Sequence, residues 1–366
     1  MTTSNILAQL GSPGVSTGFK NRIINGNMLI DQRNGGAVLT NPASSTYNVD
    51  RWYTYNTQTN KFNVQQNAGS VTPPAGFTKY VGVTGNTNYT YGAGDFFGLG
   101  QIIEGTTIQD LGWGTANAKT MTLSFWVYAS SAGTYGGGLQ NQPGVWFYNF
   151  SYTIPVANTW TYVSVIINAP TAGQGTWVTT NAAGMIIAWS LGNGSTYSTT
   201  TTGSWGTTFY NGYTGQPQIV GTNGAYFYLT GVQFEVGTTA TNYENLEYSR
   251  QLIQCQRYYY RIKPTVNYNI YGVGSSFSTT AIRITVPYPV TLRVAPTSMD
   301  FSAANLFLAE NSAGVGQTPS ALADSSNSGT NAANLNVTVS GATQGIPYNL
   351  YSNANQTSYM GFSAEL

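Results

Sequence analysis

The sequence predicts an all-β protein: a jelly-roll β-sandwich, then a short helix and a smaller C-terminal β-sandwich domain. Three observations carry this prediction. Apolar and polar side chains alternate over many short segments, turns rich in Gly, Asn, Pro and Thr separate these segments, and one stretch alone has a good helical period. With 366 residues, the chain is long enough for two or three domains with their own cores.

The clearest strand candidate is Met121–Ala129, where apolar residues from Met121 to Val127 occupy every second position. Four further segments repeat the alternation, and many short antiparallel strands of this kind indicate a sandwich or jelly roll. These segments are Val145–Tyr152, Trp160–Ile167, Gly184–Leu191 and Ala225–Val236. In the last of them the alternation changes phase, so we expect a β-bulge near Thr230-Gly231.

The one good helix candidate is Asn245–Arg257, in which Asn245 can cap the first turn. Glu247 near its start and Arg257 near its end suit the helix dipole. Residues at helical spacing form one face, which we expect to dock on a sheet. They are Leu246, Ser249, Leu252, Ile253 and Gln256.

The helix marks a domain boundary. We predict an N-terminal attachment segment over residues 1–20, the jelly roll over 21–245, the connecting helix over 246–256 and the C-terminal β domain over 257–366. Strand candidates in the C-terminal domain are Tyr258–Lys263, Thr280–Val286, Leu292–Phe301, Leu335–Val339 and Thr357–Ala364. Ala321–Asn334 is small, polar and without period, which predicts a long exposed loop.

Charged side chains are scarce, at 7% of the sequence against a usual share of about 25%. Between Lys119 and Glu235 there is no Asp, Glu, Lys, Arg or His. General acid–base and metal chemistry need ionisable groups, so this stretch favours binding or structure over catalysis. The net charge of +1 offers no field to attract a polyanion, and we expect no nucleic acid and no anionic membrane as partner.

Cys255 is the only cysteine, which excludes an intrachain disulfide. The first residues, MTTSNILAQLGSPG, do not read as a signal peptide, and no apolar run is long enough to insert into a membrane. We therefore expect the chain to fold in a cytoplasm.

Several stretches together resemble bacteriophage tail and tail-fibre proteins, especially those of marine phages and cyanophages. The stretches are Asn21–Asn34 with Tyr47–Trp52, the run TLSFWVYAS with TWTYVSV and Tyr226–Gly237, Ala240–Arg261, PVTLRVAP, and the closing Ser363–Leu366. The resemblance implies a virion component of tail, fibre or appendage type with a carbohydrate-binding-module-like jelly roll. That group has no agreed catalytic residues, so the resemblance implies none here.

The resemblance also implies location and partners. Phage proteins assemble in the host cytoplasm and leave by lysis, which accounts for a leaderless chain that works outside the cell. We expect contact with other virion proteins through the N-terminal segment, a homo-oligomer, with a trimer as first guess, and binding to host surface glycan. The alternative is a purely structural virion protein of the collar, baseplate or capsid-decorating kind, whose aromatic loops contact other subunits.

Candidate ligand-binding residues lie in two segments that we predict to be loops, Tyr197–Tyr213 and AGTYGGGLQNQPG. Aromatic rings can stack on sugars, and amide groups can bond their hydroxyls. The candidates are Tyr197, Trp205, Tyr210, Asn211 and Tyr213 in the first loop and Tyr135 and Gln140 in the second. The alternative is that these rings cap the edge of the sandwich or contact a neighbouring subunit.

Catalysis would need a pair of carboxylates, as glycoside cleavage normally does. Asp95, Glu104 and Asp110 are spread unevenly over what reads as a glycine-rich loop, so we predict no enzyme. Calcium held by Asp95 or Glu235 with backbone carbonyls is an alternative, but no EF-hand loop is present, and we predict neither a metal site nor a cofactor.

Two further charged motifs have structural interpretations. The RYYYR motif, Arg257–Arg261, resembles a nucleic-acid surface, but we interpret it as an interdomain strand. Asp50 and Arg51 pair opposite charges in a chain that avoids them, and an unpaired buried charge is costly. We therefore expect the two residues to fix a corner of the fold.

Overall fold

The computed structural model describes residues 20–366, so the predicted attachment segment lies outside the described residues except for Lys20. Internal contacts divide the chain into two compact units. Unit 1 is Met1–Leu246 with Leu366, and unit 2 is Glu247–Glu365. Within residues 20–366, none of the helices is long and apolar enough to cross a bilayer.

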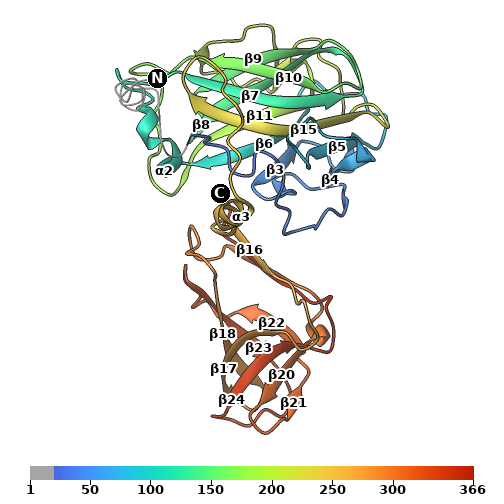
Figure 1. Ribbon diagram of the computed structural model, residues 1–366, viewed down its shortest axis with the longest axis vertical. Helices are drawn as coiled ribbons and strands as arrows, with labels where there is room; N and C mark the ends of the chain where they lie inside the picture. The colour runs from blue at the N-terminus through green and yellow to red at the C-terminus, as the bar shows by residue number, and fades with distance from the viewer. Residues whose placement is uncertain (1–19) are drawn as a thin grey trace, which may run out of the picture. The chain divides into compact units, whose positions relative to one another are not determined.

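Unit 1 contains two antiparallel sheets that face each other across one core (Figure 1). Sheet A has six strands in the order β1 (Leu39–Thr40), β4 (Phe62–Gln66), β5 (Val81–Gly85), β15 (Tyr226–Val236), β7 (Met121–Ala129) and β10 (Thr161–Ile167). Sheet B has seven, in the order β13 (Trp205–Gly206), β9 (Phe147–Ile154), β8 (Gly133–Asn141), β11 (Ala183–Asn193), β6 (Phe96–Glu104), β3 (Trp52–Asn56) and β2 (Thr46–Tyr47). The predicted all-β jelly-roll sandwich is confirmed.

Short elements connect these strands. They are η1 (Ala68–Ser70), α2 (Gly105–Ile108), η2 (Gln109–Leu111), η3 (Ser195–Tyr197) and the parallel pair β12 (Ser198–Thr199) and β14 (Gly212–Tyr213).

The core of unit 1 forms where the apolar faces of the two sheets meet. Strand β7 has the predicted alternation, and its odd-numbered residues from Met121 to Ala129 are fully buried. The ring of Phe125 on sheet A lies 5.3 Å from that of Trp189 on sheet B, edge to face. Burial of side chains of this size stabilises the fold by about 1.5–3 kcal/mol each.

The bulge predicted in β15 is present. The register of β15 against β7 shifts between Thr230 and Gln233, and Gly231 has φ +62°. Glycine adopts this left-handed conformation without the penalty that a Cβ brings. The bulge lets both Phe227 and Phe234 face the core, where each is fully buried.

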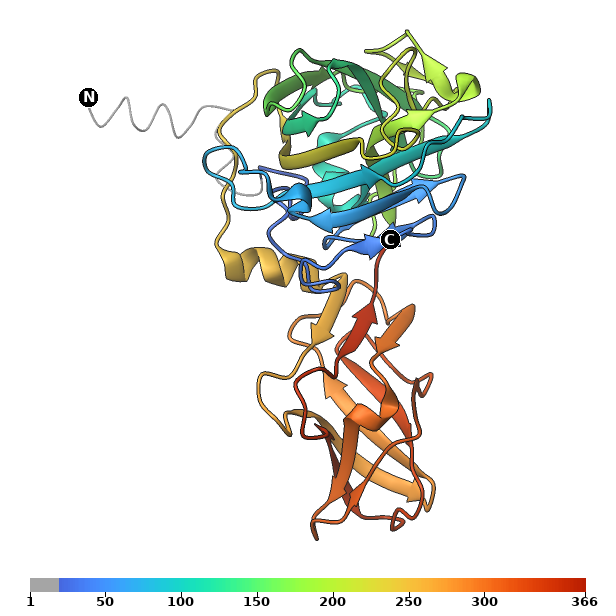
Figure 2. The same cartoon turned by 90° about the vertical axis from the view of Figure 1, so that its right-hand side faces the viewer.

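Unit 2 begins with α3 (Tyr248–Gln256) and continues as two sheets with a core of their own (Figure 2). The first sheet has the order β16 (Tyr259–Ile262), β25 (Met360–Ser363) and β19 (Ser298–Phe301). The second has the order β21 (Gly316–Gln317), β20 (Phe307–Asn311), β24 (Pro347–Ser352), β17 (Ile270–Ser278), β18 (Ala281–Pro287), β23 (Ala332–Thr338) and β22 (Ala321–Asp324). A short η4 (Ala304–Leu306) precedes β20.

The helix differs from the prediction at its start and in its buried face. Helix α3 begins at Tyr248, so Asn245 lies outside it and does not cap it. The buried residues are Gln251 and Cys255, one turn apart, whereas Ile253 is 52% exposed. Residues four apart share one face of a helix, so the buried face runs through Gln251 and Cys255 and not through the predicted apolar stripe.

Three segments predicted to be loops contain strands. Residues 321–334 contribute β22 and the start of β23, and only 325–331 connect the two strands. The prediction of a long exposed loop over these residues is therefore wrong. The segments around Gly136 and Gly98 are β8 and β6, in the middle of sheet B. Glycine has no side chain to alternate, so these strands lack the period by which strands are recognised in sequence.

Asp50 and Arg51 make local contacts, as expected for rare charges, whereas the RYYYR motif lies within unit 2 and is not an interdomain strand. The Asp50 carboxylate accepts hydrogen bonds from the main-chain and side-chain nitrogens of Gln32, at 2.9 and 2.5 Å. The buried Arg51 guanidinium donates to the carbonyl oxygen of Ile102. Arg261, in β16, forms an ion pair with Asp300 inside unit 2.

Candidate functional site

The face of sheet B that is turned away from the core carries a cavity of about 320 Å³, which we call the sheet B trough. One rung of the sheet runs across it, from Tyr53 through Gly100, Ala188 and Gly138 to Asn149, each residue directly opposite the next. Side chains alternate between the two faces of a strand, so these five positions share the outer face. The floor of the trough is therefore made of two glycines and an alanine.

The glycines of β6 are required by close approach. A Cβ added to Gly98 would lie 2.0 Å from the ring of Tyr55, and one added to Gly100 would lie 3.1 Å from the Cβ of Ala188. Glycine inside a strand commonly marks a place where another group approaches the backbone closely. Here the glycines let the Tyr55 ring pack against the sheet, and they keep side chains off the floor of the trough.

Aromatic rings form the walls. Phe96 on β6 and Phe147 on β9 each lie against Phe209, at 5.6 and 5.5 Å between ring centroids. Phe209 belongs to the segment 200–211 and so bridges two strands that are not neighbours in the sheet. The ring of Tyr197 packs edge to face against Phe96 at 4.9 Å and supports it from outside the trough.

Amide side chains supply the polar groups of the trough. The amide of Asn211 is occupied: its nitrogen donates to the carbonyl oxygen of Phe97 at 3.0 Å and to the Ser190 hydroxyl at 2.9 Å, and its oxygen accepts from Tyr55 at 2.9 Å. The amides of Gln140 and Asn149 form no hydrogen bond with any residue from 20 to 366. These two amides are available to a ligand.

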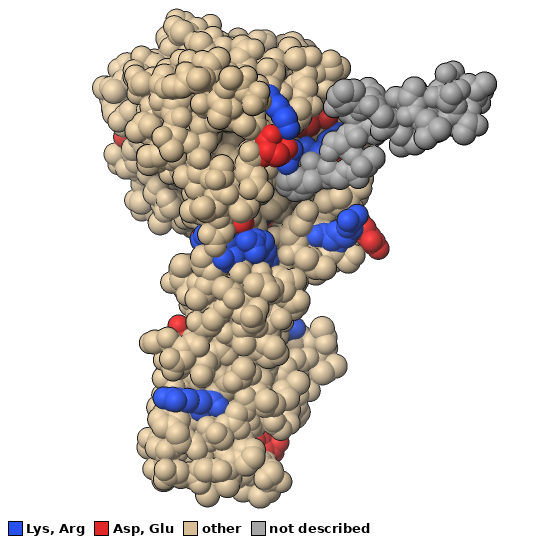
Figure 3. Space-filling view, turned by 90° about the vertical axis from the view of Figure 1, so that its left-hand side faces the viewer, with Lys and Arg blue, Asp and Glu red and all other residues tan. Residues whose placement is uncertain are grey.

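The residues lining the trough include no Asp, Glu, Lys, Arg or His. Burial raises the pKa of the Tyr53 hydroxyl well above its usual value, and burial also raises the pKa of Tyr55. Both tyrosines are therefore neutral at pH 7. Figure 3 shows the same scarcity on one face of the molecule, where charged side chains form a few separate patches. The trough suits an uncharged ligand.

The seven predicted ligand-binding residues are only partly brought together. Gln140, Tyr210 and Asn211 line the trough, although the Asn211 amide holds the loop in place instead of facing a ligand. Tyr197 and Tyr213 belong to the same segment but do not line it.

Trp205 lies in a cluster of tryptophans at the edge of sheet B. Its indole nitrogen donates to the carbonyl oxygen of Asn168 at 2.7 Å, and its ring packs edge to face against Trp113 and Trp177 at 5.6 and 5.3 Å. This geometry matches the alternative in which the ring caps the edge of the sandwich.

Tyr135 requires a correction. It lies in strand β8, not in a loop, and its side chain is fully buried against Tyr152 and Phe227. A buried ring on the core face cannot contact a ligand in the trough, so Tyr135 does not belong to the candidate site.

Sequence reasoning missed most of the walls and the whole floor. The missed residues include Tyr53, Tyr55, Phe96, Phe147, Asn149, Ala188 and Phe209. Two features of the sequence could have indicated these residues. Tyr53 and Tyr55 lie two positions apart in an aromatic segment, and three consecutive glycines, 136–138, precede Gln140. A glycine run inside a strand pattern indicates a low floor.

Asp95 and Glu104 lie too far apart to form a catalytic pair. Asp95 directly precedes β6 and Glu104 ends it, and nine extended residues span about 30 Å. Paired carboxylates of glycosidases lie about 5–10 Å apart. Asp110 pairs with Arg22 at 2.8 Å. Within residues 20–366, no three His, Cys, Asp or Glu side chains are grouped so that they could hold a metal ion.

No protein-family model and no curated protein matches the sequence. The chain is similar to the solved enzymatically active domain of tailspike protein 4 from bacteriophage CBA120, with 14% identity and TM-score 0.30 over 58% of this chain and 23% of that one. The match thus spans less than a quarter of that solved domain.

Carbohydrate-binding modules are also among the similar structures. A family 11 module of a Clostridium thermocellum cellulase has 12% identity and TM-score 0.28 over 57% of this chain and 98% of the module. A xylan-binding domain from Paenibacillus barcinonensis has 10% identity and TM-score 0.26 over 57% and 99%.

Proposed function

We propose that unit 1 binds a neutral glycan in the sheet B trough. The observation that carries this proposal is the lining itself: aromatic rings and unpaired amides around a glycine and alanine floor, without a charged side chain. A volume of about 320 Å³ lies at the lower end of the range for ligand pockets, about 300–1,000 Å³. The trough therefore suits a short segment of a sugar chain.

Each part of the trough has a role in this proposal. The floor at Gly100, Ala188 and Gly138 admits the flat face of a pyranose ring close to the sheet. The rings of Tyr210 and Phe209 cover its apolar C–H groups. The amides of Gln140 and Asn149 exchange hydrogen bonds with its hydroxyls and reject ligands that leave them unpaired.

We further propose that the chain acts on a virion, as a tail or tail-fibre protein that carries this glycan site to a host surface. Support comes from the sequence resemblance to phage tail proteins that runs from Asn21 to Leu366. In this role the protein binds and does not cleave, works as a homo-oligomer, with a trimer as first expectation, and is released by lysis. Attachment of purified protein to host cells, and its location in intact particles, test this part separately.

Binding of the full chain to a panel of neutral glycans tests the trough. The panel contains cello-, laminari-, xylo- and maltohexaose and a mannan, and the measurement is isothermal titration calorimetry. We expect Tyr210→Ala to weaken binding about tenfold, because one stacked ring is lost. Tyr213→Ala is the matched control, since it removes the same side chain from the same segment but outside the trough. Equal affinity of the two variants, or no binding to any neutral glycan, would overturn the proposal.

A further inference from the structure

A second cavity, of about 600 Å³, lies on the outer face of sheet A, and we call it the sheet A groove. All the residues that line it belong to unit 1. We propose that this groove is a second, independent binding site for neutral sugar rings, on the sheet opposite the trough. The inference shares its ligand class with the proposed function but depends on different residues.

The base of the groove is an aromatic rung. Tyr162 on β10 lies directly opposite Trp126 on β7, which lies opposite Thr230 on β15. The rings of Tyr162 and Trp126 are 5.3 Å apart, and Tyr162 is 46% exposed. The indole nitrogen of Trp126 has no hydrogen-bond partner among the described residues and is not buried. The rung therefore offers both a ring surface and a donor.

The β-bulge lets a third aromatic ring approach the rung. A Cβ added to Gly231 would lie 2.6 Å from the ring of Phe77 and 3.1 Å from that of Trp126. Phe77 in turn packs edge to face against Tyr243 at 5.1 Å. The bulge thus places a third ring beside the rung, from a segment distant in sequence.

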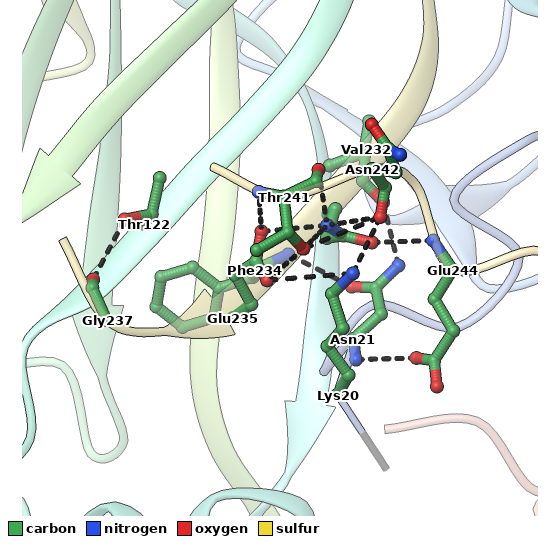
Figure 4. Close-up of polar contacts among 11 residues, drawn as sticks. Lys20, Asn21, Thr122, Val232, Phe234, Glu235, Gly237, Thr241, Asn242 and Glu244 are labelled. Atoms are coloured by element: carbon green, nitrogen blue, oxygen red, sulfur yellow. Dashed lines mark hydrogen bonds and ion pairs between the residues drawn. The ribbon is translucent and has the colours of Figure 1, made fainter. Parts of the chain in front are cut away.

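Buried polar side chains hold the opposite wall, residues 240–245, in place (Figure 4). The Glu235 carboxylate accepts hydrogen bonds from the main-chain nitrogen of Thr241 at 2.8 Å and from its hydroxyl at 2.7 Å. Gln233, which is fully buried, donates to Glu235 at 2.8 Å and accepts from the main-chain nitrogen of Glu244 at 2.8 Å. The wall is therefore set before any ligand arrives, which lowers the entropic cost of binding.

The charge of Glu235 does not face the groove. Glu235 is 3% exposed, and its carboxylate oxygens accept hydrogen bonds from Thr241 and Gln233. Lys20 lies 3.8 Å from it and donates to the carbonyl oxygen of Asn242 at 2.6 Å. The residues lining the groove are uncharged, so its chemistry is that of rings, hydroxyls and amides.

The polar groups that remain favour a sugar over an apolar partner. The side-chain amides of Asn242 and Asn245 line the groove, are exposed, and form no hydrogen bond with residues 20–366. Together with the Trp126 nitrogen they give several donors and acceptors around an aromatic base. A ring ligand with hydroxyls at its edge and C–H groups on its face can satisfy both, as sugars do.

Two sites on opposite sheets would let one molecule contact two glycan chains or two parts of one chain. Linked sites raise the avidity for a polymer far above that of either site alone. Short oligosaccharides and polysaccharides should therefore differ in how strongly each variant affects them.

Calorimetry of the full chain with the same hexasaccharide panel tests the groove. We expect Tyr162→Ala to weaken one class of site about tenfold and to leave the other class unchanged. Ile166→Ala is the matched control, because Ile166 is 47% exposed on the same face of β10 but does not line the groove. Thermal unfolding of both variants shows whether the fold is retained, and Trp126→Phe provides a second variant that removes the donor but keeps a ring.

The outcomes separate the two proposals. If Tyr210→Ala abolishes all sugar binding and Tyr162→Ala behaves like Ile166→Ala, the groove is not a sugar site and the trough stands. If only Tyr162→Ala weakens sugar binding, the groove is the sugar site and the proposal for the trough is wrong. Binding of a proline-rich peptide to the groove, in place of every sugar, also overturns the inference.

Discussion

The hydroxyl group of Tyr55 donates a hydrogen bond of 2.9 Å to the side-chain oxygen of Asn211, a residue 156 positions further along the chain. This bond joins strand β3 to the loop that covers one end of the sheet B trough. The amide nitrogen of Asn211 is bound to Phe97 and Ser190 as well, so the loop is fixed to three strands of sheet B at one residue.

We expect Tyr55→Phe to loosen this loop while the sheet stays folded. The buried oxygen of Asn211 would lose its partner, at a cost of about 1–2 kcal/mol in the free energy of unfolding. Hydrogen exchange of residues 197–213 should increase, and denaturant unfolding should report the loss in stability. Tyr213→Phe serves as control, because that hydroxyl bonds to no residue of the described chain. Unchanged exchange in Tyr55→Phe would show that the bond does not hold the loop.

Filling the trough should remove binding at that site without a loss of stability. Ala188 lies in the middle of the floor, with glycines opposite it on both neighbouring strands, so Ala188→Leu has room on the outer face. We expect affinity for a neutral glycan to fall more than about tenfold, since the added side chain occupies the place of a sugar ring. Calorimetry measures the affinity and thermal unfolding checks the fold. Ala132→Leu, at an exposed turn, should bind like the natural protein. Undiminished affinity in Ala188→Leu would place the ligand elsewhere.

Glycan affinity should depend weakly on salt and pH. No charged side chain lines the trough, so salt up to about 1 M has no ion pair there to screen. Tyr53 and Tyr55 have a pKa above the usual 10.0 because they are buried, and they stay protonated to at least that pH. We expect the dissociation constant to change less than about twofold between about pH 5 and pH 9. A steep fall in affinity with added salt would indicate that charged groups bind the ligand.

The strands of the sandwich core could be predicted from sequence because their side chains alternate. Met121–Ala129 has the predicted bounds, and the bulge at Gly231 followed from a change of phase between Phe227 and Phe234. A buried face imposes an apolar residue at every second position, and this constraint is local to each strand. It can therefore be read without knowing which strands are neighbours.

The trough could not be predicted in the same way. Its floor comes from β6, β8 and β11, whose order in the sheet is not the order in the sequence. The residues that meet on one rung, such as Gly100 and Gly138, carry no side chain that signals burial. Seven candidates were chosen for their aromatic rings or amides. Gln140, Tyr210 and Asn211 line the trough, and the other four support it or lie away from it. The composition indicated an uncharged ligand, whereas the order of the strands in the sheet determines where its binding site lies.

Asp95 is 6% exposed, and none of the cationic side chains within residues 20–366 pairs with it. Its carboxylate accepts hydrogen bonds from the Tyr89 hydroxyl, from the main-chain nitrogen of Gly92 at 2.7 Å, and from Gln58 and Thr57 at 3.1 Å each. Burial by itself would raise the pKa of Asp95, but these donors outweigh it, and the pKa lies below its usual 3.8. The ionised form is thus the one that the fold stabilises.

The sign of the pH dependence follows from that direction. Because the folded pKa of Asp95 is below the unfolded one, its contribution to stability is fully present above about pH 4 and is lost as the pH falls through the folded value. We expect Asp95→Asn to lower the free energy of unfolding by about 1.5–3 kcal/mol at pH 7, and by less as the pH approaches about 2. Denaturant unfolding at several pH values measures this difference, with Glu310→Gln as a control for the loss of one charge. Parallel curves for Asp95→Asn and the natural protein between about pH 5 and pH 2 would show that this carboxylate does not couple folding to protonation.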